Sequence, residues 1–308
     1  MNTSTLAIKV SGISKSYGSV KALDNISLDV RRGEIFGLIG PDGAGKTTLF
    51  KILVTLLNAD SGLAQVDGLD VQKDYKKIRS RVGYMPGKFS LYPDLTIREN
   101  MEFFASLFGV TVEQNYDLVA PIYSQIEKFS NRRAGRLSGG MKQKLALSCA
   151  LIHKPSVLFL DEPTTGVDAV SRSEFWDMLF NLKEQGLSIL VSTPYMDEAS
   201  RCDRIALINN GHVLDIDTPQ NMVDNYDAPL YGVKCDNMYE MLKKLRKVES
   251  IANCYTTGEY HHIVASKEFD VERLIQDLTD NGLKNIELKA VIPDIEDVFI
   301  KLLSNEQQ

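Results

Sequence analysis

The sequence predicts an α/β protein, with helices packed on a sheet, followed by a smaller α+β domain. Over roughly the first 225 residues, apolar runs of strand length alternate with helical segments, an order that favours a sheet with helices packed on it. From about Ala228 the chain is organised differently, with amphipathic helices and a strand of period two. The length of 308 residues also fits two domains at about 150 residues each. We expect a first domain at 1–225 and an accessory domain at 226–308.

The composition is that of a globular protein. It argues against a basic nucleic-acid-binding protein, a membrane-spanning protein and a disulfide-rich or zinc-binding protein. Hydrophobic residues make up 44% of the chain, so a sizeable core can form. The formal net charge of −6 argues against binding to nucleic acid through general basicity, because phosphate neutralisation dominates such binding. No apolar run approaches the roughly 18 residues of a membrane span, and the first residues show no signal-peptide pattern. The spacing of the four cysteines suggests neither zinc nor a disulfide framework, so we expect buried thiols in a reducing compartment.

The first domain should contain three buried strands, at Glu34–Gly40, Val157–Leu160 and Leu187–Ser192. A Gly-rich turn follows the first strand, and the apolar residues of Thr48–Leu57 then predict a helix. Between about residues 87 and 155 the composition becomes helical, which indicates an inserted helical subdomain.

The second domain is predicted to follow a β-α-β-β-α-β-α order. Residues 285–292 alternate with period two, which places Ile286, Leu288, Ala290 and Ile292 on one face of a strand. Shorter strands are expected at 230–235, 251–255 and 261–265. Apolar residues at i, i+3, i+4 and i+7 predict three helices, at 238–245, 271–278 and 295–302.

Side chains at the ends of these helices support the assignment. Asp270 and Asp294 stand where N-caps belong, and Gly282 stands where the second helix should end. His261 and His262 are adjacent and would face opposite ways in a strand, so we expect surface histidines and no metal pair. The tail carries no chemical motif.

The turn after the first buried strand, Gly40–Thr47, matches the pattern G-x-x-x-x-G-K-[ST]. Glycines allow backbone N–H groups to point at phosphate oxygens, and the N-terminus of the following helix favours negative charge. Lys46 would reach the β- and γ-phosphates, and Thr47 would offer its hydroxyl to Mg²⁺. The predicted nucleotide-binding residues of this segment are Gly40, Pro41, Asp42, Gly43, Ala44, Gly45, Lys46, Thr47 and Thr48.

Two adjacent acids end the second buried strand. Asp161 would hold Mg²⁺, as carboxylates do for this hard cation. Glu162 is the candidate that orients and polarises the attacking water. Two acids after a strand are more often loop acids or helix caps, but together with the phosphate loop the catalytic interpretation is favoured.

The phosphate loop and the two acids are also compatible with kinases, GTPases and many other ATPases. Residues Leu137–Gln143, with the letters LSGGMKQ, exclude most of these classes. Here the sequence resembles the ATP-binding cassette (ABC) family, whose signature motif this is, over about residues 5–225. Ser138, Gly139 and Gly140 precede a helix and so offer a second N-terminus to an anion. The run from Asn131 to Leu160 has six basic residues and no acidic one, which fits a surface that faces phosphates.

The resemblance implies a P-loop nucleotide-binding domain with a RecA-like core, an antiparallel β subdomain and a helical subdomain. It also implies ATP and Mg²⁺ as cofactors, and head-to-tail dimers with ATP between one chain's phosphate loop and the other's signature. Tyr17 matches the aromatic residue that stacks on adenine, and Gly166–Asp168 matches the loop that crosses the dimer interface. The tail residues Ile292–Phe299 resemble the closing segment of ATPases that serve small ABC-2-type exporters.

Three positions depart from the family pattern. The family expects Gln where this chain has Gly87, His where it has Pro194, and Asn or Ser where it has Asp42. Glycine has no side chain, and proline neither donates a backbone hydrogen bond nor titrates. Two polar contacts to the γ-phosphate region are therefore missing, which predicts slow hydrolysis at this chain's own site.

We therefore predict the ATP-hydrolysing subunit of an ABC exporter, soluble when isolated and held at the cytoplasmic face of the cell membrane. Its expected partners are a second ABC ATPase chain and separate transmembrane permease subunits, without nucleic acid. Two alternatives stay open: a weakly hydrolysing, structural subunit of a heterodimer, and a soluble ABC protein without a transport role. The single signature and the lack of sustained heptads argue against the last alternative.

Overall fold

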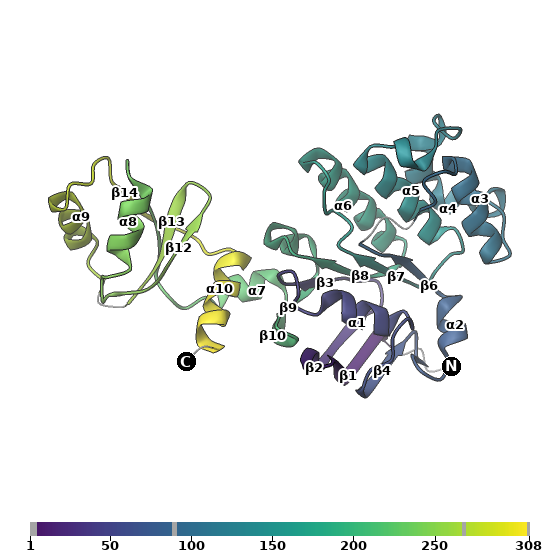
Figure 1. Ribbon diagram of the computed structural model, residues 1–308, viewed down its shortest axis with the longest axis horizontal. Helices are drawn as coiled ribbons and strands as arrows, with labels where there is room; N and C mark the ends of the chain where they lie inside the picture. The colour runs from purple at the N-terminus through teal and green to yellow at the C-terminus, as the bar shows by residue number, and fades with distance from the viewer. Residues whose placement is uncertain (1–4, 88–90, 267–268, 307–308) are drawn as a thin grey trace. The chain divides into compact units, whose positions relative to one another are not determined.

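The computed structural model describes residues 5–87, 91–266 and 269–306. The chain divides into two compact units, Met1–Pro219 and Gln220–Gln308 (Figure 1). The sequence placed the boundary at 225, whereas the structure groups nearly all of helix α7 (Pro219–Asp224) with the second unit.

The first unit is built on a six-stranded sheet in the order β10-β9-β3-β8-β7-β6. Its first five members along the chain are parallel, and β10 is antiparallel to β9. Every residue of β3, β7 and β8 is buried, which explains why the middle of each strand is apolar. The strands are β3 (Ile35–Ile39), β6 (Val82–Met85), β7 (Val157–Asp161), β8 (Ser188–Thr193), β9 (Arg204–Asn209) and β10 (His212–Asp217). The three strands expected from the sequence are confirmed.

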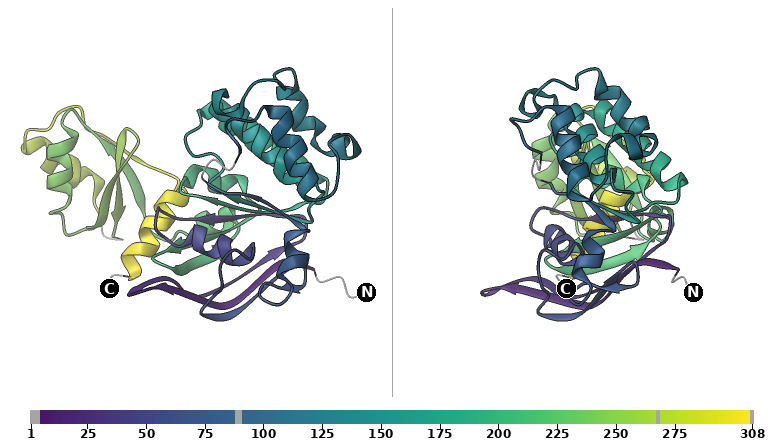
Figure 2. Two further views of the ribbon diagram at one scale, coloured as in Figure 1. Left: turned by 45° about the vertical axis from the view of Figure 1, so that its right-hand side comes forward. Right: turned by 90° about the vertical axis from the view of Figure 1, so that its right-hand side faces the viewer.

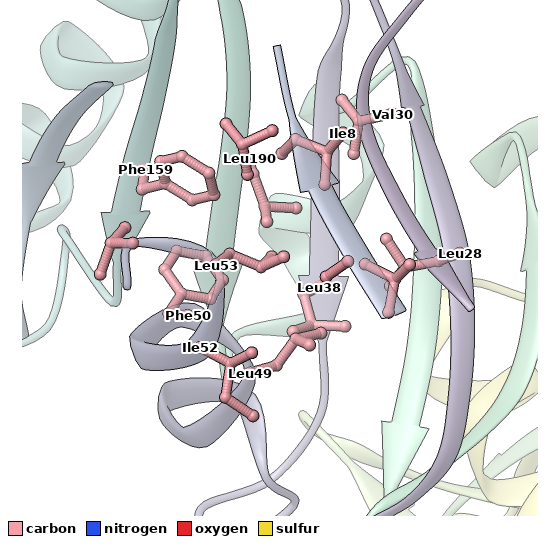
Figure 3. Close-up of a cluster of buried hydrophobic side chains, with 14 of the residues drawn as sticks. Ile8, Leu28, Val30, Leu38, Leu49, Phe50, Ile52, Leu53, Phe159 and Leu190 are labelled. Atoms are coloured by element: carbon pink, nitrogen blue, oxygen red, sulfur yellow. The ribbon is translucent and has the colours of Figure 1, made fainter. Parts of the chain in front are cut away.

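A second, antiparallel sheet has the order β2-β1-β4-β5, from β1 (Leu6–Tyr17), β2 (Val20–Arg31), β4 (Ser61–Val66) and β5 (Leu69–Asp70). Helix α1 (Lys46–Leu53) lies between the two sheets, where Phe50 meets Phe159 of β7 edge to face at 6.0 Å (Figure 3). The helix was expected to continue to Leu57 but ends at Leu53, and Thr55 takes a left-handed φ of 65°. A short helix, α2 (Tyr75–Arg79), follows this sheet.

The helical subdomain lies between β6 and β7 in the chain, as predicted. It contains α3 (Ile97–Leu107), η1 (Glu113–Asn115), α4 (Tyr116–Glu127), η2 (Ala134–Arg136) and α5 (Gly139–Leu151). Thr96 starts α3 through a capping box with Glu99. Helices α5 and α6 (Ala169–Glu184) lie on the opposite side of the six-stranded sheet from α1 (Figures 1 and 2). The 3₁₀ helix η3 (Met196–Arg201) follows β8.

The second unit has the predicted β-α-β-β-α-β-α order after α7. Its antiparallel sheet runs β12-β13-β11-β14. Asn237 and Asp270 cap α8 and α9, as their spacing to Glu240 and Arg273 allows. The elements are β11 (Leu230–Lys234), α8 (Met238–Leu245), β12 (Ile251–Thr257), β13 (Tyr260–Ala265), α9 (Val271–Asp280), β14 (Glu287–Ala290) and α10 (Ile295–Glu306).

Two expectations about this unit are wrong. His261 is 3% exposed, and its Nε2 lies 2.8 Å from the Met238 carbonyl oxygen of α8, while His262 Nδ1 lies 2.7 Å from Asp297 Oδ1 of α10. The two rings do face opposite ways, but helices cover both faces, so neither is a surface histidine. The strand at 285–292 is shorter than expected, and Ile292 lies beyond it, 87% exposed.

In the described part of the chain, no helix is both long and apolar enough to cross a bilayer. The same residues contain no cluster of three or more His, Cys, Asp or Glu side chains suited to a metal. All four cysteines are free and buried, as expected. Burial raises the pKa of the Cys149 and Cys202 thiols, so these two side chains stay protonated.

Candidate functional site

The carboxyl ends of the parallel strands meet at one edge of the six-stranded sheet, where ligands bind in sheets of this kind. The turn at 40–45 leaves β3 there, and Asp161 ends β7. Thr47 Oγ1, in the first turn of α1, lies 3.2 Å from Asp161 Oδ1. Residues predicted from two separate motifs are therefore neighbours in space.

The turn after β3 needs its glycines. Gly43 and Gly45 have φ values of 82° and 105°, in the left-handed region that side chains disfavour. A Cβ atom at Gly40 would lie 2.1 Å from the Ile208 carbonyl oxygen, and one at Gly45 would lie 2.4 Å from that of Ala22. The backbone can curl in front of the N-terminus of α1 only because these positions lack side chains.

Lys46 folds back over this turn. Its Nζ donates to the carbonyl oxygens of Gly40 and Pro41 at 2.8 and 3.0 Å, and lies 3.1 Å from Glu162 Oε1. The residue is 3% exposed. The buried ammonium group therefore lies against the turn and has three oxygen acceptors, which an anion could replace.

Ser192 fixes both acids, and sequence reasoning missed it. Its hydroxyl donates to Asp161 Oδ1 at 2.7 Å and accepts from the Glu162 amide at 3.1 Å. The parallel register pairs Asp161 with Ser192, so the polar end of β8 was a usable signal. Glu162 has a left-handed φ of 52°, a strained conformation held by this contact. Burial, and then the Asp161 carboxylate, raise the pKa of the nearby Tyr84 phenol.

Tyr17 lies at the tip of the hairpin between β1 and β2, opposite Val20, and is 49% exposed. Further along β2, Ala22 contacts the turn at Gly45, as described above. An exposed aromatic ring thus lies at the end of a hairpin whose second strand passes the turn at 40–45.

The remaining predicted residues lie at a second place, the N-terminus of α5. Ser138 caps that helix by accepting from the Met141 amide at 3.4 Å. A Cβ atom at Gly139 would lie 3.5 Å from the Gly166 carbonyl oxygen, and one at Gly140 would lie 2.8 Å from Ser171 Oγ. The signature segment therefore packs on the 166–171 segment of its own chain.

Comparison with known proteins identifies this arrangement. The model of the ABC transporter family matches residues 23–165. Over 317 residues the chain is 34% identical to the "Nod factor export ATP-binding protein I" of Burkholderia orbicola, with 99% of each chain covered. The chain belongs to the ABC transporter family. It is also 32% identical to the "Daunorubicin resistance ATP-binding protein DrrA2" of Streptomyces coeruleorubidus, covering 98% of this chain and 96% of that protein.

Other ABC proteins agree with this assignment. The chain is 36% identical to the "Probable multidrug ABC transporter ATP-binding protein YbhF" of Escherichia coli, but spans only 52% of that protein's length. Among solved structures, an ATP-binding subunit of an ABC transporter gives a TM-score of 0.65 at 28% identity, covering 72% of this chain and 93% of that one. The dimeric ATP-binding cassette MJ0796, bound to ADP and Pi, gives a TM-score of 0.63 at 26% identity. The match covers 68% of this chain and 98% of that chain. The predicted fold class and the predicted membership of the ABC family are confirmed.

The three positions that depart from the ABC pattern, Gly87, Pro194 and Asp42, each have a distinct local environment. A Cβ atom at Gly87 would lie 3.0 Å from the Asp161 carbonyl oxygen, closer than ordinary contact. Pro194 follows β8, and the chain turns there because the Tyr195 amide donates to Thr193 Oγ1 at 3.1 Å. Asp42 is exposed, so solvent screens the charge of this carboxylate.

Sequence reasoning also missed a polar network next to Glu162. Thr164, two residues after Glu162, donates its hydroxyl to Glu198 at 3.1 Å, and Glu198 is 3% exposed. Arg172 Nε, on α6, lies 3.3 Å from the other oxygen of Glu198. These side chains connect three segments far apart in the sequence, and no spacing pattern could have paired them.

Proposed function

We propose that this chain is the ATP-hydrolysing subunit of an exporter and acts with a second ABC ATPase chain and separate transmembrane permease subunits. The observation that carries the proposal is the meeting of Lys46, Thr47, Asp161 and Glu162 at one sheet edge. Relatives named for Nod factor export and daunorubicin resistance favour export as the direction of transport.

The phosphates of ATP would lie along the turn at 40–47, against backbone amides and the positive end of α1. Lys46 would exchange the carbonyl oxygens of Gly40 and Pro41 for phosphate oxygens without moving far, because its Nζ already faces the turn. Tyr17 is exposed at its hairpin tip and would supply a flat apolar surface for adenine.

The Thr47 hydroxyl and the Asp161 carboxylate fit Mg²⁺, because both are hard oxygen donors and they are already 3.2 Å apart. The bound ion supplies positive charge beside the β- and γ-phosphate oxygens. Ser192 keeps the Asp161 carboxylate in place for this role through its 2.7 Å hydrogen bond.

Glu162 would orient a water molecule toward the γ-phosphorus and accept its proton. Its side chain is 23% exposed, so a water molecule can reach it. Its carboxylate lies 3.1 Å from Lys46 Nζ. ATP would draw the lysine toward phosphate and release the carboxylate for water.

Ser138, Gly139 and Gly140 would act on the ATP of the second ABC chain. The hydroxyl of Ser138 and the N-terminus of α5 offer hydrogen-bond donors to an anion. These residues pack on the 166–171 segment of their own chain. We propose that the phosphate loop of the second chain completes this site. A dimeric solved relative supports this arrangement.

An apolar groove of about 290 Å³ is the proposed seat for a helix of the permease. It lies between the helical subdomain and the six-stranded sheet, with Leu56, Phe104 and Leu107 among its lining residues. Leu56 and Leu107 are 59% and 61% exposed, an unusual exposure for two large apolar residues that share one groove. Through this contact the chain would be held at the cytoplasmic face of the membrane.

Gly87 and Pro194 favour a second arrangement, in which this chain is the weakly hydrolysing member of a heterodimer. Its own site lacks two polar contacts, whereas its signature is intact and can serve the partner's site. In a complex with the partner, Ser138→Arg would then stop turnover, while Glu162→Gln would reduce it only slightly. Complete loss of turnover in Glu162→Gln would show that this chain's own site is the working one.

The proposal is tested by expressing the chain together with the proteins encoded beside it. We expect it to co-purify with a multi-span membrane protein in detergent and to hydrolyse ATP in that complex. Leu107→Glu, in the apolar groove, should release it from membranes, whereas Glu102→Lys, on the exposed side of the same helix, should not. A chain that stays soluble when every neighbouring gene is expressed would refute the transport role.

A further inference from the structure

Helix α5 makes a side-chain contact that the roles above leave unexplained. Gln143 is 6% exposed, and its Nε2 donates to the carbonyl oxygen of Pro163, the residue after Glu162. We infer that Gln143 is a positioning residue, which fixes the backbone that carries the Glu162 carboxylate. This inference rests on the proposed ATP hydrolysis and adds a residue to it.

The backbone on either side of Glu162 is held from two directions. On the β8 side, the Glu162 amide donates to the Ser192 carbonyl and hydroxyl oxygens at 3.0 and 3.1 Å. On the α5 side, Gln143 holds the Pro163 carbonyl. A residue with a left-handed φ of 52° stays in that conformation only when its surroundings oppose relaxation, and these two contacts do so.

The amide of Gln143 carries a cost that an apolar side chain would avoid. Its Oε1 is buried without a hydrogen-bond partner among the described residues. A buried acceptor without a partner destabilises the folded chain. Methionine would fill the same volume without this cost, so the useful part of the side chain is the donor that reaches Pro163.

The position of Gly87 makes this support more important. Gly87, Gln143 and Glu162 line the same hollow of about 160 Å³, between the end of β6, α5 and the segment after β7. Gly87 offers no side chain to the Glu162 segment from the β6 side. Gln143 provides a polar side-chain contact from the α5 side instead.

The contact also connects two proposed sites within one chain. Helix α5 begins at Gly139, next to Ser138, and carries Gln143 one turn later. The signature offered to a partner and the segment after Glu162 are therefore joined by one hydrogen bond. A displacement of α5 when the signature meets ATP would move the Glu162 backbone with it.

The test uses the full chain and the variant Gln143→Met, with Gln125→Met as the matched control. Gln125 makes the corresponding bond to the Pro121 carbonyl at 2.9 Å, but on the exposed side of α4. We expect Gln143→Met to bind ATP within about twofold of wild type and to slow single-turnover hydrolysis about tenfold or more, since small misplacements of a catalytic group have such effects. Gln125→Met should change neither quantity.

Two further measurements keep the inference testable if hydrolysis is very slow or Gln143→Met folds poorly. Hydrogen exchange at the amides of Thr165 and Val167, which close the turn after Glu162, should be faster in Gln143→Met. In Gln143→Glu, a protonated carboxyl can again donate to Pro163. Burial raises the pKa of a carboxyl group. The hydrolysis rate of Gln143→Glu, divided by that of wild type, should therefore rise as the pH falls from about 8 to about 6.

The outcomes separate the inference from the proposed function. Unchanged exchange in a folded Gln143→Met, or a flat pH ratio for Gln143→Glu, would overturn the positioning role. Absence of hydrolysis in wild type and in every variant would instead count against the ATPase, while the exchange measurement would still decide the role of Gln143.

Discussion

Replacing Lys46 by alanine should weaken ATP binding by about 2–4 kcal/mol. Lys46 Nζ has three acceptors within 3.1 Å, on Gly40, Pro41 and Glu162, which phosphate oxygens would replace on binding. Hydrogen bonds to charged groups contribute about 1.5–3 kcal/mol each, and two such bonds to phosphate are partly offset by the contacts given up. The expected loss is a factor of about 30 to 1,000 in Kd.

Isothermal titration of the full chain with ATP and Mg²⁺ measures this loss. Lys51→Ala is the matched control, because Lys51 is exposed in the last turn of the same helix. We expect its Kd to stay within about twofold of wild type. A Lys46→Ala variant that is folded and binds ATP within about threefold of wild type would refute the assignment of the turn at 40–47 as the phosphate site.

Other predictions follow from the departures and from the second unit. Pro194→His should raise single-turnover hydrolysis at least about tenfold and Pro194→Ala should not, since one positioned donor is typically worth 10²–10³ in rate; equal rates would contradict the slow-site explanation. Gly87→Ala should lower the free energy of unfolding by about 1–3 kcal/mol in urea denaturation, because its Cβ would crowd the Asp161 carbonyl at 3.0 Å; unchanged stability would mean that the segment relaxes freely. Asp297→Ala should destabilise the second unit by about 3–5 kcal/mol, because Asp297 is fully buried and pairs with His262; a change below about 1 kcal/mol would show that pair to be unimportant. A chain ending at Pro219 should keep ATP affinity within about threefold, and a larger loss in a folded truncation would place the second unit in the site.

Local patterns were sufficient for the elements that carry most of the site. The apolar strand at 35–39, the glycines after it and Lys46 are contiguous in the chain, so their arrangement follows from the local backbone. Asp161 ends β7 and Glu162 follows it, at the same edge of the sheet as the end of β3, because β3 and β7 both pair in parallel with β8.

Contacts between segments far apart in the sequence could not be predicted. Ser192 meets Asp161 through strand register, and Gln143 meets Pro163 through the packing of α5 on the sheet. No pattern in the sequence pairs Ser192 with Asp161 or Gln143 with Pro163. These contacts depend on the order β3-β8-β7, which alternation of strands and helices leaves undetermined.

The second unit shows the same limit. Helical periodicity identified the three helices, but not which sheet faces they cover. His261 and His262 were therefore expected at the surface, whereas α8 and α10 each bury one ring. The end of the last strand was also misjudged, because an alternating pattern continues to Ile292 after pairing with β11 has ended at Ala290.

Single-turnover hydrolysis of Mg-ATP by the full chain, compared between wild type and Glu162→Gln, tests the central claim most directly. The wild-type chain should convert bound ATP to ADP, slowly because of Gly87 and Pro194. Glu162→Gln should bind ATP as tightly or more tightly, since a carboxylate beside Lys46 is neutralised, and should be at least about a hundredfold slower. Equal rates for the two proteins would contradict the claim that Glu162 activates the attacking water at the edge formed by Lys46, Thr47 and Asp161.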